Sequence, residues 1–400
     1  MRRHPDIVII GAGVIGLSIA ISILNSNRNL QVAVLEKERT LGAHASGRNS
    51  GVLHAGFYYS ADSLKARFCS EGNVALRALC REFNIPVREV GKVVVTTNAL
   101  EEELLAQLYE RGIRNGVKLE RLEKRDLGTI EPLAVTQESF IWSPTTAVSD
   151  PESVLRALAT KVTALGGTIL FGQEAFITLN PNTITTKSVS WQPKHLVNAS
   201  GTQADRIAKC FGFGEGLTMI PFMGVYRCVA ESKLSLKRLV YPVPNPLNPF
   251  LGVHLTISVH GLIKIGPTAI PLLNREQYSL LEKWNLKDIR ESIVGLNAIF
   301  HGNFHSIPAL ARSEFPKIFT SCLVSSASRL VPSIRELTNW EKMKPGIRAQ
   351  LVDTKSGQLV NDFLVDGDEN STHVLNAVSP GWTAALPFGN FVAQRVLTHF

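Results

Sequence analysis

The sequence predicts an α/β protein with a Rossmann-like first domain, discontinuous in sequence, and an inserted α+β domain that holds a mixed sheet. One observation is the length, because 400 residues exceed what a single hydrophobic core usually organises. A second is the order of segments at the N-terminus, where the β-branched run 7–10 leads through a glycine-rich turn into the apolar helical segment 18–24. A third is the return of strand and helix patterns at residues 151–201 and again from residue 373.

The turn after the first strand has the spacing Gly-x-Gly-x-x-Gly, formed by Gly11, Gly13 and Gly16. The first glycine permits the tight turn, the second lets a pyrophosphate approach the backbone, and the third lets the helix pack closely on the strand. The free amides of the helix N-terminus then face the phosphates. A second predicted strand, residues 31–35, ends at Glu36, and 36 − 16 = 20 residues separate this acid from the third glycine. Because a carboxylate at that spacing accepts hydrogen bonds from a ribose, the sequence predicts a dinucleotide site.

The segment that follows this acid favours FAD over NAD as the dinucleotide. Residues 46–52 (Ser-Gly-Arg-Asn-Ser-Gly-Val) are mostly small and polar, where NAD enzymes usually continue the alternation of strand and helix. The segment resembles the loop that flavoproteins of the D-amino-acid-oxidase superfamily place along the pyrophosphate and the isoalloxazine ring. An NAD dehydrogenase, which would be colourless when purified, stays an alternative.

Two later parts of the chain are interpreted as returns of the same domain. Residues 151–165 carry one apolar helical face, and residues 168–171 form a predicted strand. Residues 195–201 read as a further strand that ends in small residues. Near the C-terminus, a strand at 373–377 leads into the tight loop 379–383 and a final helix. A loop of this kind before a helix N-terminus suits contact with the flavin pyrimidine edge, where negative charge accumulates on reduction.

These returns define the predicted domains. We expect an FAD-binding domain from residues 1–76, 149–215 and 344–400, and a substrate domain from residues 77–148 and 216–343. The substrate domain is expected to contain strands at 92–97, 221–229 and 262–266, a proline-rich rigid loop at 241–249, and a helix at 282–300. The residues predicted to contact FAD are Gly11, Gly13, Gly16, Glu36, Lys37, Asn49, Ser50, Gly51, Val52, Ser200, Gly201, Gly381 and Thr383.

The charge pattern bears on the partners of the protein. The formal net charge is +8, from 42 Lys and Arg against 34 Asp and Glu. However, no run of five basic residues occurs, and residues 118–126 alternate in sign, as expected for a solvated helix face. This pattern excludes a dedicated nucleic-acid partner. It predicts a mild field that attracts small anions or an acidic membrane surface.

Cysteine usage and hydropathy bear on the location of the protein. Five scattered cysteines without Cys-x-x-Cys spacing predict reduced thiols, and no cluster has the spacing of metal ligands. Residues 7–24 contain no charge, yet their strand-turn-helix order argues against a membrane span or a signal peptide. We therefore expect a cytoplasmic protein without a transmembrane segment or a metal, in peripheral contact with the inner face of the membrane.

Three blocks of sequence are similar to the L-2-hydroxyglutarate dehydrogenase/oxidase family. They are residues 49–73 (Asn-Ser-Gly-Val-Leu-His-Ala-Gly-Phe-Tyr-Tyr-Ser onward), residues 241–267 and residues 344–363. The resemblance extends over roughly residues 5–395. The chain departs from the family at Met223, where a basic residue is usual, and at Arg48, Gly381 and Trp382. The missing basic residue at Met223 predicts a weaker provision for a second substrate carboxylate.

The resemblance implies the FAD-dependent oxidation of L-2-hydroxyglutarate, or of a close small anionic 2-hydroxy acid, to the 2-oxo acid. It also implies a site in which His54 or His254 is the base, Arg348 binds a carboxylate and Tyr241 contributes a hydroxyl, with Tyr58 and Tyr59 as further candidates. Hydride transfer to flavin N5 needs such a base, cations for the carboxylates and a dry pocket. The expected electron acceptor is a quinone of the membrane pool or oxygen.

Two alternatives remain open from the sequence. An amino-acid or amine oxidase of the same superfamily would apply the same hydride chemistry to a C–N bond. A non-catalytic or RNA-modification-associated flavoprotein would use the dinucleotide structurally, and the absence of basic clusters argues against it.

Overall fold

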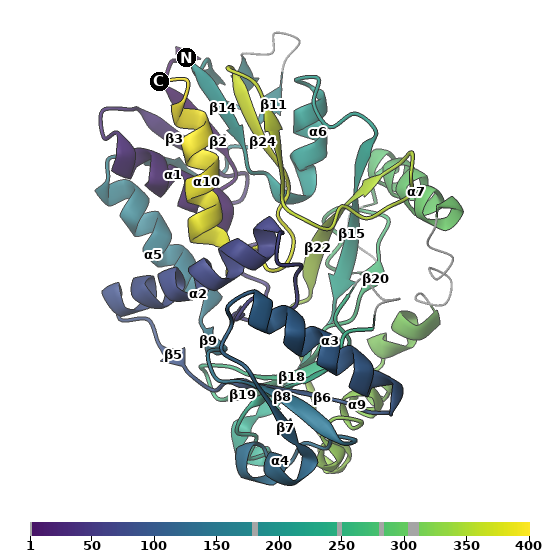
Figure 1. The fold of residues 1–400 in the computed structure, drawn as a ribbon. Helices are drawn as coiled ribbons and strands as arrows, with labels where there is room; N and C mark the ends of the chain where they lie inside the picture. Colours follow the sequence, from purple (N-terminus) through teal and green to yellow (C-terminus); the bar gives the residue numbers. More distant parts are fainter. Residues whose placement is uncertain (1, 178–182, 246–249, 280–283, 303–311) are drawn as a thin grey trace.

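The computed structural model describes residues 2–177, 183–245, 250–279, 284–302 and 312–400. Two large sheets occupy opposite ends of the molecule, and two three-stranded sheets lie between them (Figure 1). This is the mixed α/β architecture that the sequence predicts. The predicted domain boundaries stay a proposal, and the one after residue 76 falls within helix α2 (Leu64–Glu82).

The first large sheet carries the glycine-rich turn. Its strands are, in spatial order, β10 (Thr168–Leu170), β3 (Val32–Leu35), β2 (Ile7–Ile10), β14 (His195–Asn198), β24 (Ser371–Asn376) and β23 (Leu364–Gly367). All neighbouring strands are parallel except β23, which is antiparallel at the edge. This arrangement brings three segments that are far apart in sequence into one sheet.

Both faces of this sheet are covered, which explains why its strands are continuous apolar runs. Ile7 and Ile9 pack on one face with helices α1 (Val14–Ser26), α5 (Pro151–Ala164) and α10 (Ala385–Leu397). Val8 and Ile10 point to the other face, toward a small sheet of four short strands. Those strands are β1 (Arg2–Arg3), β13 (Ser190–Trp191), β12 (Ile184–Thr185) and β11 (Phe176–Ile177).

The second large sheet has eight strands. In spatial order they are β21 (Glu341–Lys342), β16 (Arg227–Ala230), β19 (Leu262–Gly266), β18 (His254–Ile257), β17 (Leu239–Pro242), β6 (Lys92–Val95), β8 (Ser139–Ser143) and β7 (Glu120–Glu123). The β17–β6 pair is parallel and the other pairs are antiparallel, so the sheet is mixed. Helices α3 (Leu100–Arg114), α4 (Lys124–Ile130) and α9 (Thr320–Ala327) pack against it.

Two three-stranded sheets connect the large ones. One has the order β20 (Ile270–Pro271), β15 (Leu217–Gly224), β22 (Gly346–Asp353), and helix α7 (Leu286–His301) packs on it. The other has the order β4 (Val52–Leu53), β9 (Ala147–Ser149), β5 (Val87–Arg88). Both join strands from the two predicted domains.

Three local predictions were wrong. Residues 221–229 are not one strand, because the chain leaves β15 at Gly224 and enters a different sheet as β16. The charged stretch 118–126 starts as the exposed edge strand β7 before it becomes α4. Charged side chains on an edge strand discourage further pairing, which explains why a polar sequence is tolerated there. Tyr241 lies in β17 rather than in a loop, while residues 246–249 lie outside the described residues.

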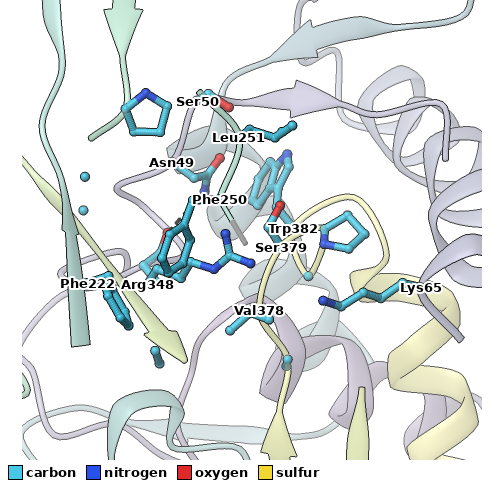
Figure 2. A pocket seen from close by; sticks show the side chains of 18 of the residues that line it. Asn49, Ser50, Lys65, Phe222, Phe250, Leu251, Arg348, Val378, Ser379 and Trp382 are labelled. Atoms are coloured by element: carbon cyan, nitrogen blue, oxygen red, sulfur yellow. Dashed lines mark hydrogen bonds between the residues drawn. The ribbon is translucent and has the colours of Figure 1, made fainter. Parts of the chain in front are cut away.

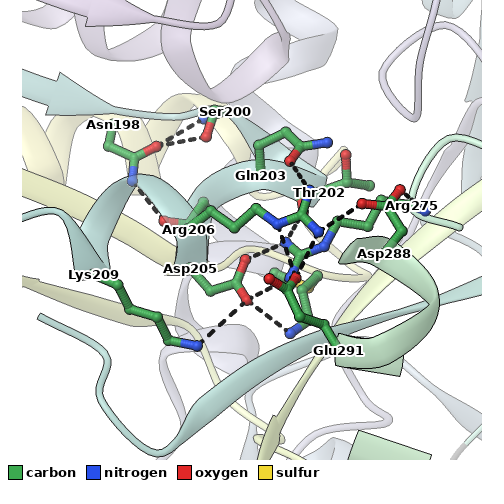
Figure 3. A network of polar contacts seen from close by, with 12 residues as sticks. Asn198, Ser200, Thr202, Gln203, Asp205, Arg206, Lys209, Arg275, Asp288 and Glu291 are labelled. Atoms are coloured by element: carbon green, nitrogen blue, oxygen red, sulfur yellow. Dashed lines mark hydrogen bonds and ion pairs between the residues drawn. The ribbon is translucent and has the colours of Figure 1, made fainter. Parts of the chain in front are cut away.

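A buried ion-pair network fixes the connection between the first sheet and α7 (Figure 3). Arg275 is fully buried and pairs with Asp205 of α6 (Ala204–Lys209), at 2.8 Å from Nη2 to Oδ2, and with Glu291 of α7 at 2.6 Å. Arg206 pairs with Asp288 at 2.6 Å and shares Glu291. Because each buried charge has an opposite partner, the segment after β14 is held against α7.

Candidate functional site

A cavity of about 720 Å³ lies between the two large sheets, beyond the carboxyl end of β2 and of β14. Ligands of open parallel sheets bind at this end of the strands. Gly13 and Gly201 line the cavity on the side of the first sheet, whereas His54, Tyr241 and His254 line it on the side of the second.

The glycine-rich turn presents the N-terminus of α1 to this cavity. Gly11 has φ +104°, and a Cβ there would lie 2.5 Å from the carbonyl oxygen of Ala199, so only glycine fits. A Cβ at Gly16 would lie 2.0 Å from the oxygen of Gly11. Gly13 is less crowded by protein, since the nearest atom to its Cβ would be Ser46 Oγ at 3.0 Å, and it borders the cavity directly. The turn thus leaves space on the side where a pyrophosphate would approach.

The acid at the end of β3 is held over this turn. Glu36 accepts hydrogen bonds from the backbone amides of Ala12 (2.9 Å) and Glu38 (2.9 Å). Lys37, by contrast, is turned away from the cavity and forms an ion pair with Glu276. Glu36 therefore lies over the glycine-rich turn, where its role as a ribose acceptor stays a prediction, and Lys37 lies in a partly buried ion pair.

Only some of the predicted FAD residues line the cavity. The lining ones are Gly13, Asn49, Ser50, Val52, Gly201 and Gly381. The others, which do not line it, are Gly11, Gly16, Glu36, Lys37, Gly51, Ser200 and Thr383. Gly51, at φ +77°, approaches Ser149, and Ser200 Oγ donates to Asn198 at 2.7 Å.

Thr383 is buried and holds the loop that carries His54. Its hydroxyl donates to the carbonyl oxygen of Val52 at 3.1 Å and accepts from the backbone amide of His54 at 3.1 Å. From the other side, the amide of Asn73 in α2 donates to the carbonyl oxygens of Leu53 (2.9 Å) and His54 (3.1 Å). These contacts fix the backbone of His54 from the loop before α10 and from α2.

The four predicted catalytic side chains, His54, His254, Arg348 and Tyr241, all line this one cavity. The rings of Tyr241 and His254 are stacked, with centroids 3.8 Å apart. His254 Nδ1 lies 2.8 Å from the carbonyl oxygen of Gly252, which only accepts, so Nδ1 carries the proton and Nε2 keeps its lone pair.

Both histidines are neutral at physiological pH. Burial and, to a smaller extent, the charge of Lys92 lower the pKa of His254 to about 3, despite the hydrogen bond to Gly252. Burial also lowers the pKa of His54 well below its usual value, with additional contributions from Lys92 and His254. A neutral imidazole can accept a proton, so the site has two available bases.

Arg348 lies on β22 with no hydrogen bond or ion pair to any described residue, and its Nε is buried. Burial lowers the pKa of its guanidinium to about 10, which leaves it protonated at neutral pH. Its charge lies 4.9 Å from the ring centroid of Phe250. Figure 2 shows the guanidinium beside Phe250, pointing into the cavity.

Other unpartnered polar atoms face the same region. Among the described residues, they are His54 Nδ1, Tyr58 Oη, Tyr241 Oη, Arg348 Nε and Trp382 Nε1. Buried polar groups are normally hydrogen-bonded, so these atoms are suited to form hydrogen bonds with the polar groups of a ligand. The glycine turn and these atoms together fit a bound dinucleotide and a small polar substrate.

Two lysines near the cavity were missed from the sequence. Lys65 lines the cavity from α2. Lys92 is fully buried behind the cavity wall. Its Nζ lies 4.4–4.7 Å from the ring centroids of Phe57, Tyr58 and Tyr241. A lysine that opens an otherwise apolar strand, as Lys92 does, was the available signal. Lys65 was part of a family block but carried no pattern that separated it from a surface lysine.

The interpretation of Met223 was wrong. Side chains alternate along β15, so Phe222 lines the cavity while Met223 points to the opposite face. There it packs with Val225, Ile270, Leu272 and Ile347. A departure from the family at this position therefore does not remove a charge from the cavity.

Three side chains of metal-binding type also meet near the end of β3. Ligand atoms of Glu38, His44 and Glu276 lie within 4.8 Å of one another. Lys37 pairs with Glu276, and Tyr278 Oη lies 2.7 Å from His44 Nδ1. The positive charge that this group needs is thus supplied by the chain itself.

The fold and this cavity place the protein among the flavin-dependent oxidoreductases. The chain belongs to the FAD dependent oxidoreductase family (DAO), whose profile matches residues 6–395, and FAD is the cofactor of that family. The predictions of the superfamily, the fold class and the cofactor are thereby confirmed.

Curated relatives cover nearly the whole chain. The L-2-hydroxyglutarate dehydrogenase of Indibacter alkaliphilus is 36% identical over 99% of this chain and 99% of its own. The enzyme of the same name from Escherichia coli K12 is 34% identical, over 98% and 93%. The mitochondrial one from Bos taurus is 32% identical, over 99% and 89%. The chain therefore groups with this family, as its sequence blocks predict.

Solved structures show the same fold. The L-α-glycerophosphate oxidase of Mycoplasma pneumoniae with FAD bound has a TM-score of 0.75 at 22% identity, over 99% of this chain and 95% of its own. The glycine oxidase of Geobacillus kaustophilus has a TM-score of 0.72 at 20% identity, over 99% and 95%.

The substitution Gly13→Val should abolish retention of FAD. The side chain would enter the space between the helix N-terminus and Ser46, where the pyrophosphate must approach. Absorbance of the purified protein between 350 and 500 nm, roughly the flavin range, measures the bound fraction. Gly128→Val is the matched control, because a Cβ there meets nothing within 4 Å. Full flavin content in the Gly13 variant would show that the turn does not hold the cofactor.

Proposed function

We propose that the protein catalyses the FAD-dependent oxidation of L-2-hydroxyglutarate to the 2-oxo acid. The support from relatives is that curated proteins at 31–36% identity carry the name L-2-hydroxyglutarate dehydrogenase. The observation that carries the proposal is the unpaired guanidinium of Arg348 in the same cavity as the neutral His254. FAD, when bound, accepts the hydride of the substrate α-carbon at its N5 atom.

Arg348 is the group expected to hold the α-carboxylate. A guanidinium binds a carboxylate through two parallel hydrogen bonds, and the bond is strengthened by charge. No other described residue makes a hydrogen bond or an ion pair with the guanidinium of Arg348. The substrate carboxylate therefore does not have to displace an internal partner. This geometry orients the α-carbon while the hydroxyl stays free to reach a base.

His254 is the preferred base for the hydroxyl proton. Its Nε2 has a lone pair because Nδ1 donates to Gly252, and Tyr241 fixes the plane of its ring by stacking. His54 has the same protonation state, but its Nδ1 is buried without a partner, so its tautomer is not fixed. The defined tautomer favours His254.

The charge of the cavity favours an acid over an amine as the substrate. Arg348 and Lys65 line the cavity, and Lys92 lies directly behind its wall. Among the described residues, Asp362 is the only lining carboxylate, and it accepts hydrogen bonds from the backbone amides of Leu64 and Lys65. A positive field repels a substrate ammonium group and attracts carboxylates.

Anaerobic stopped-flow reduction of the bound flavin tests the proposed function. L-2-Hydroxyglutarate should bleach the flavin rapidly, and L-lactate, L-malate and glycine more slowly. Arg348→Met should reduce kcat/KM for L-2-hydroxyglutarate by about 100-fold or more, because a buried carboxylate would lose its charged partner. Reduction by glycine alone would favour the amino-acid oxidase alternative and refute the proposal.

His254→Gln should slow flavin reduction by about 100-fold or more while the substrate dissociation constant changes little, because a base acts in the transition state. The rate of flavin reduction in the wild type, at saturating substrate, should stay level as the pH falls from about 8 to about 5. The reason is that a group with a pKa of about 3 keeps its lone pair over this range. His54→Gln, examined in parallel, should have the smaller effect. A larger effect at His54 would transfer the role of base to that residue.

We also propose that the reduced flavin passes its electrons to a quinone of the membrane pool. The protein would reach this quinone by peripheral contact with an anionic membrane at its cytoplasmic face. No described helix is both long and apolar enough to span a bilayer. The support is the outer face of α7, where Leu286, Ile293 and Phe300 are exposed at seven-residue intervals beside Lys287 and Arg290.

Sedimentation with anionic vesicles tests this contact. The wild type should bind, more weakly at high salt, and Ile293→Ser should reduce binding. Leu100→Ser is the control, because Leu100 is also an exposed aliphatic residue but lies on α3, away from this face. Equal loss of binding in both variants, or turnover with NAD⁺ at the rate of a quinone analogue, would contradict the proposal.

A further inference from the structure

We propose that Lys65 binds the second carboxylate of the substrate and thereby selects dicarboxylic over monocarboxylic 2-hydroxy acids. The inference rests on the proposed function and extends it to a residue that determines specificity. The observations are the position of Lys65 in the cavity, its burial without a partner, and its relation to Arg348.

The backbone of Lys65 is fixed at the first turn of α2. The hydroxyl of Ser63 accepts from the amide of Ala66 at 3.1 Å and begins the helix. The carboxylate of Asp362 accepts from the amides of Leu64 (2.8 Å) and Lys65 (3.0 Å). An acid at a helix N-terminus is favourable, and here it ties α2 to the segment that follows β22. The side chain of Lys65 therefore leaves a rigid position and enters the cavity.

The side chain of Lys65 is buried without a counter-ion. The residue is 6% exposed, and its ammonium makes no hydrogen bond or ion pair to any described residue. The nearest ring is that of Tyr59, at 5.8 Å. Asp362 is the neighbouring anion, yet backbone amides already occupy its oxygens. Burying an ammonium group without a partner is costly, and an anionic ligand removes that cost.

Lys65 and Arg348 approach the cavity from opposite sides. Figure 2 shows Arg348 on one side and Lys65 on the other, with both cationic ends directed toward the space between them, near Val378 and Ser379. The two groups are close enough for the charge of Arg348 to act on Lys65. Two unpaired cations in one cavity match a ligand with two negative charges. A 2-hydroxy dicarboxylate has this charge, and its monocarboxylate analogue would leave Lys65 unpaired.

The experiment compares two substrates of equal length, L-2-hydroxyglutarate and L-2-hydroxypentanoate, which lacks only the second carboxylate. Lys65→Met should lower kcat/KM for the dicarboxylate by about 100-fold and for the monocarboxylate by less than about fivefold. Lys65→Arg should restore most of the activity with the dicarboxylate, because it keeps the charge. Arg67→Met, two residues further along α2 and exposed, is the matched control and should behave as the wild type.

A second measurement follows binding without turnover. Titration calorimetry of the FAD-loaded protein with glutarate and with pentanoate gives the affinity of each. Lys65→Met should lose affinity for glutarate alone. This result would support the proposal even if neither hydroxy acid reduced the flavin, an outcome that would refute only the proposed function. Equal losses for both ligands or both substrates, or no loss, would overturn the role of Lys65.

The pH dependence of glutarate binding provides a further readout. Burial and the charge of Arg348 lower the pKa of Lys65 to about 7, and Asp362 opposes this shift. Of the groups that face Lys65, Arg348 has a pKa of about 10 and the pKa of Tyr59 is raised by burial, so neither titrates there. Burial also lowers the pKa of Lys92, behind the cavity wall, to about 7, and this lysine is present in both proteins. Glutarate affinity should therefore fall more steeply as the pH rises through 7 in the wild type than in Lys65→Arg. The same fall in both proteins would count against the proposal.

Discussion

The burial of positive charge without a counter-ion is the constraint on which the site depends. Arg348, Lys65 and Lys92 lie in or behind one cavity, and none has a hydrogen bond or an ion pair among the described residues. Other buried cations have partners: Arg275 pairs with Asp205 and Glu291, and Arg227 donates hydrogen bonds to Thr320 and to two backbone carbonyl oxygens. The difference is informative, because an unpaired buried charge costs stability that a ligand can recover. Of these three unpaired cations, Arg348 and Lys65 line the space for the substrate, and Lys92 lies behind its wall.

The fold maintains this arrangement through contacts that lie outside the cavity. Thr383, in the loop before α10, and Asn73 of α2 hold the backbone of His54, and Asp362 holds the start of α2. The network around Arg275 joins the segment after β14 to α7 and β15. Each of these contacts joins segments that are far apart in sequence. Consequently, the groups of the cavity are placed by the meeting of the two large sheets rather than by any one loop.

The predictability of each feature follows from the range of the interactions that create it. The nucleotide turn could be predicted, since Gly11, Gly16 and Glu36 act within one strand-turn-helix-strand unit with fixed spacing. The strand at 221–229 was predicted as one piece because apolar residues continue through Gly224. The change of sheet depends on strand partners that lie far from it in the sequence. Lys65 could not be recognised, because its burial arises where α2 meets β22. Met223 was misread for the same reason, since the facing of β15 is set by tertiary contacts.

The charges and the bases of the cavity divide the chemistry between them. Burial and Lys92 keep His254 and His54 unprotonated, so the histidines contribute no positive charge to substrate binding. The guanidinium of Arg348 keeps its proton, so it contributes charge and no base. Tyr241 connects the two functions, because its ring lies between the ammonium group of Lys92 and the imidazole of His254. A carboxylate can thus be held by cations that do not take part in proton transfer, while the hydroxyl proton passes to a base whose lone pair no cation blocks. This separation suits the oxidation of an anionic alcohol, in which binding needs fixed positive charge and the chemical step needs a neutral base.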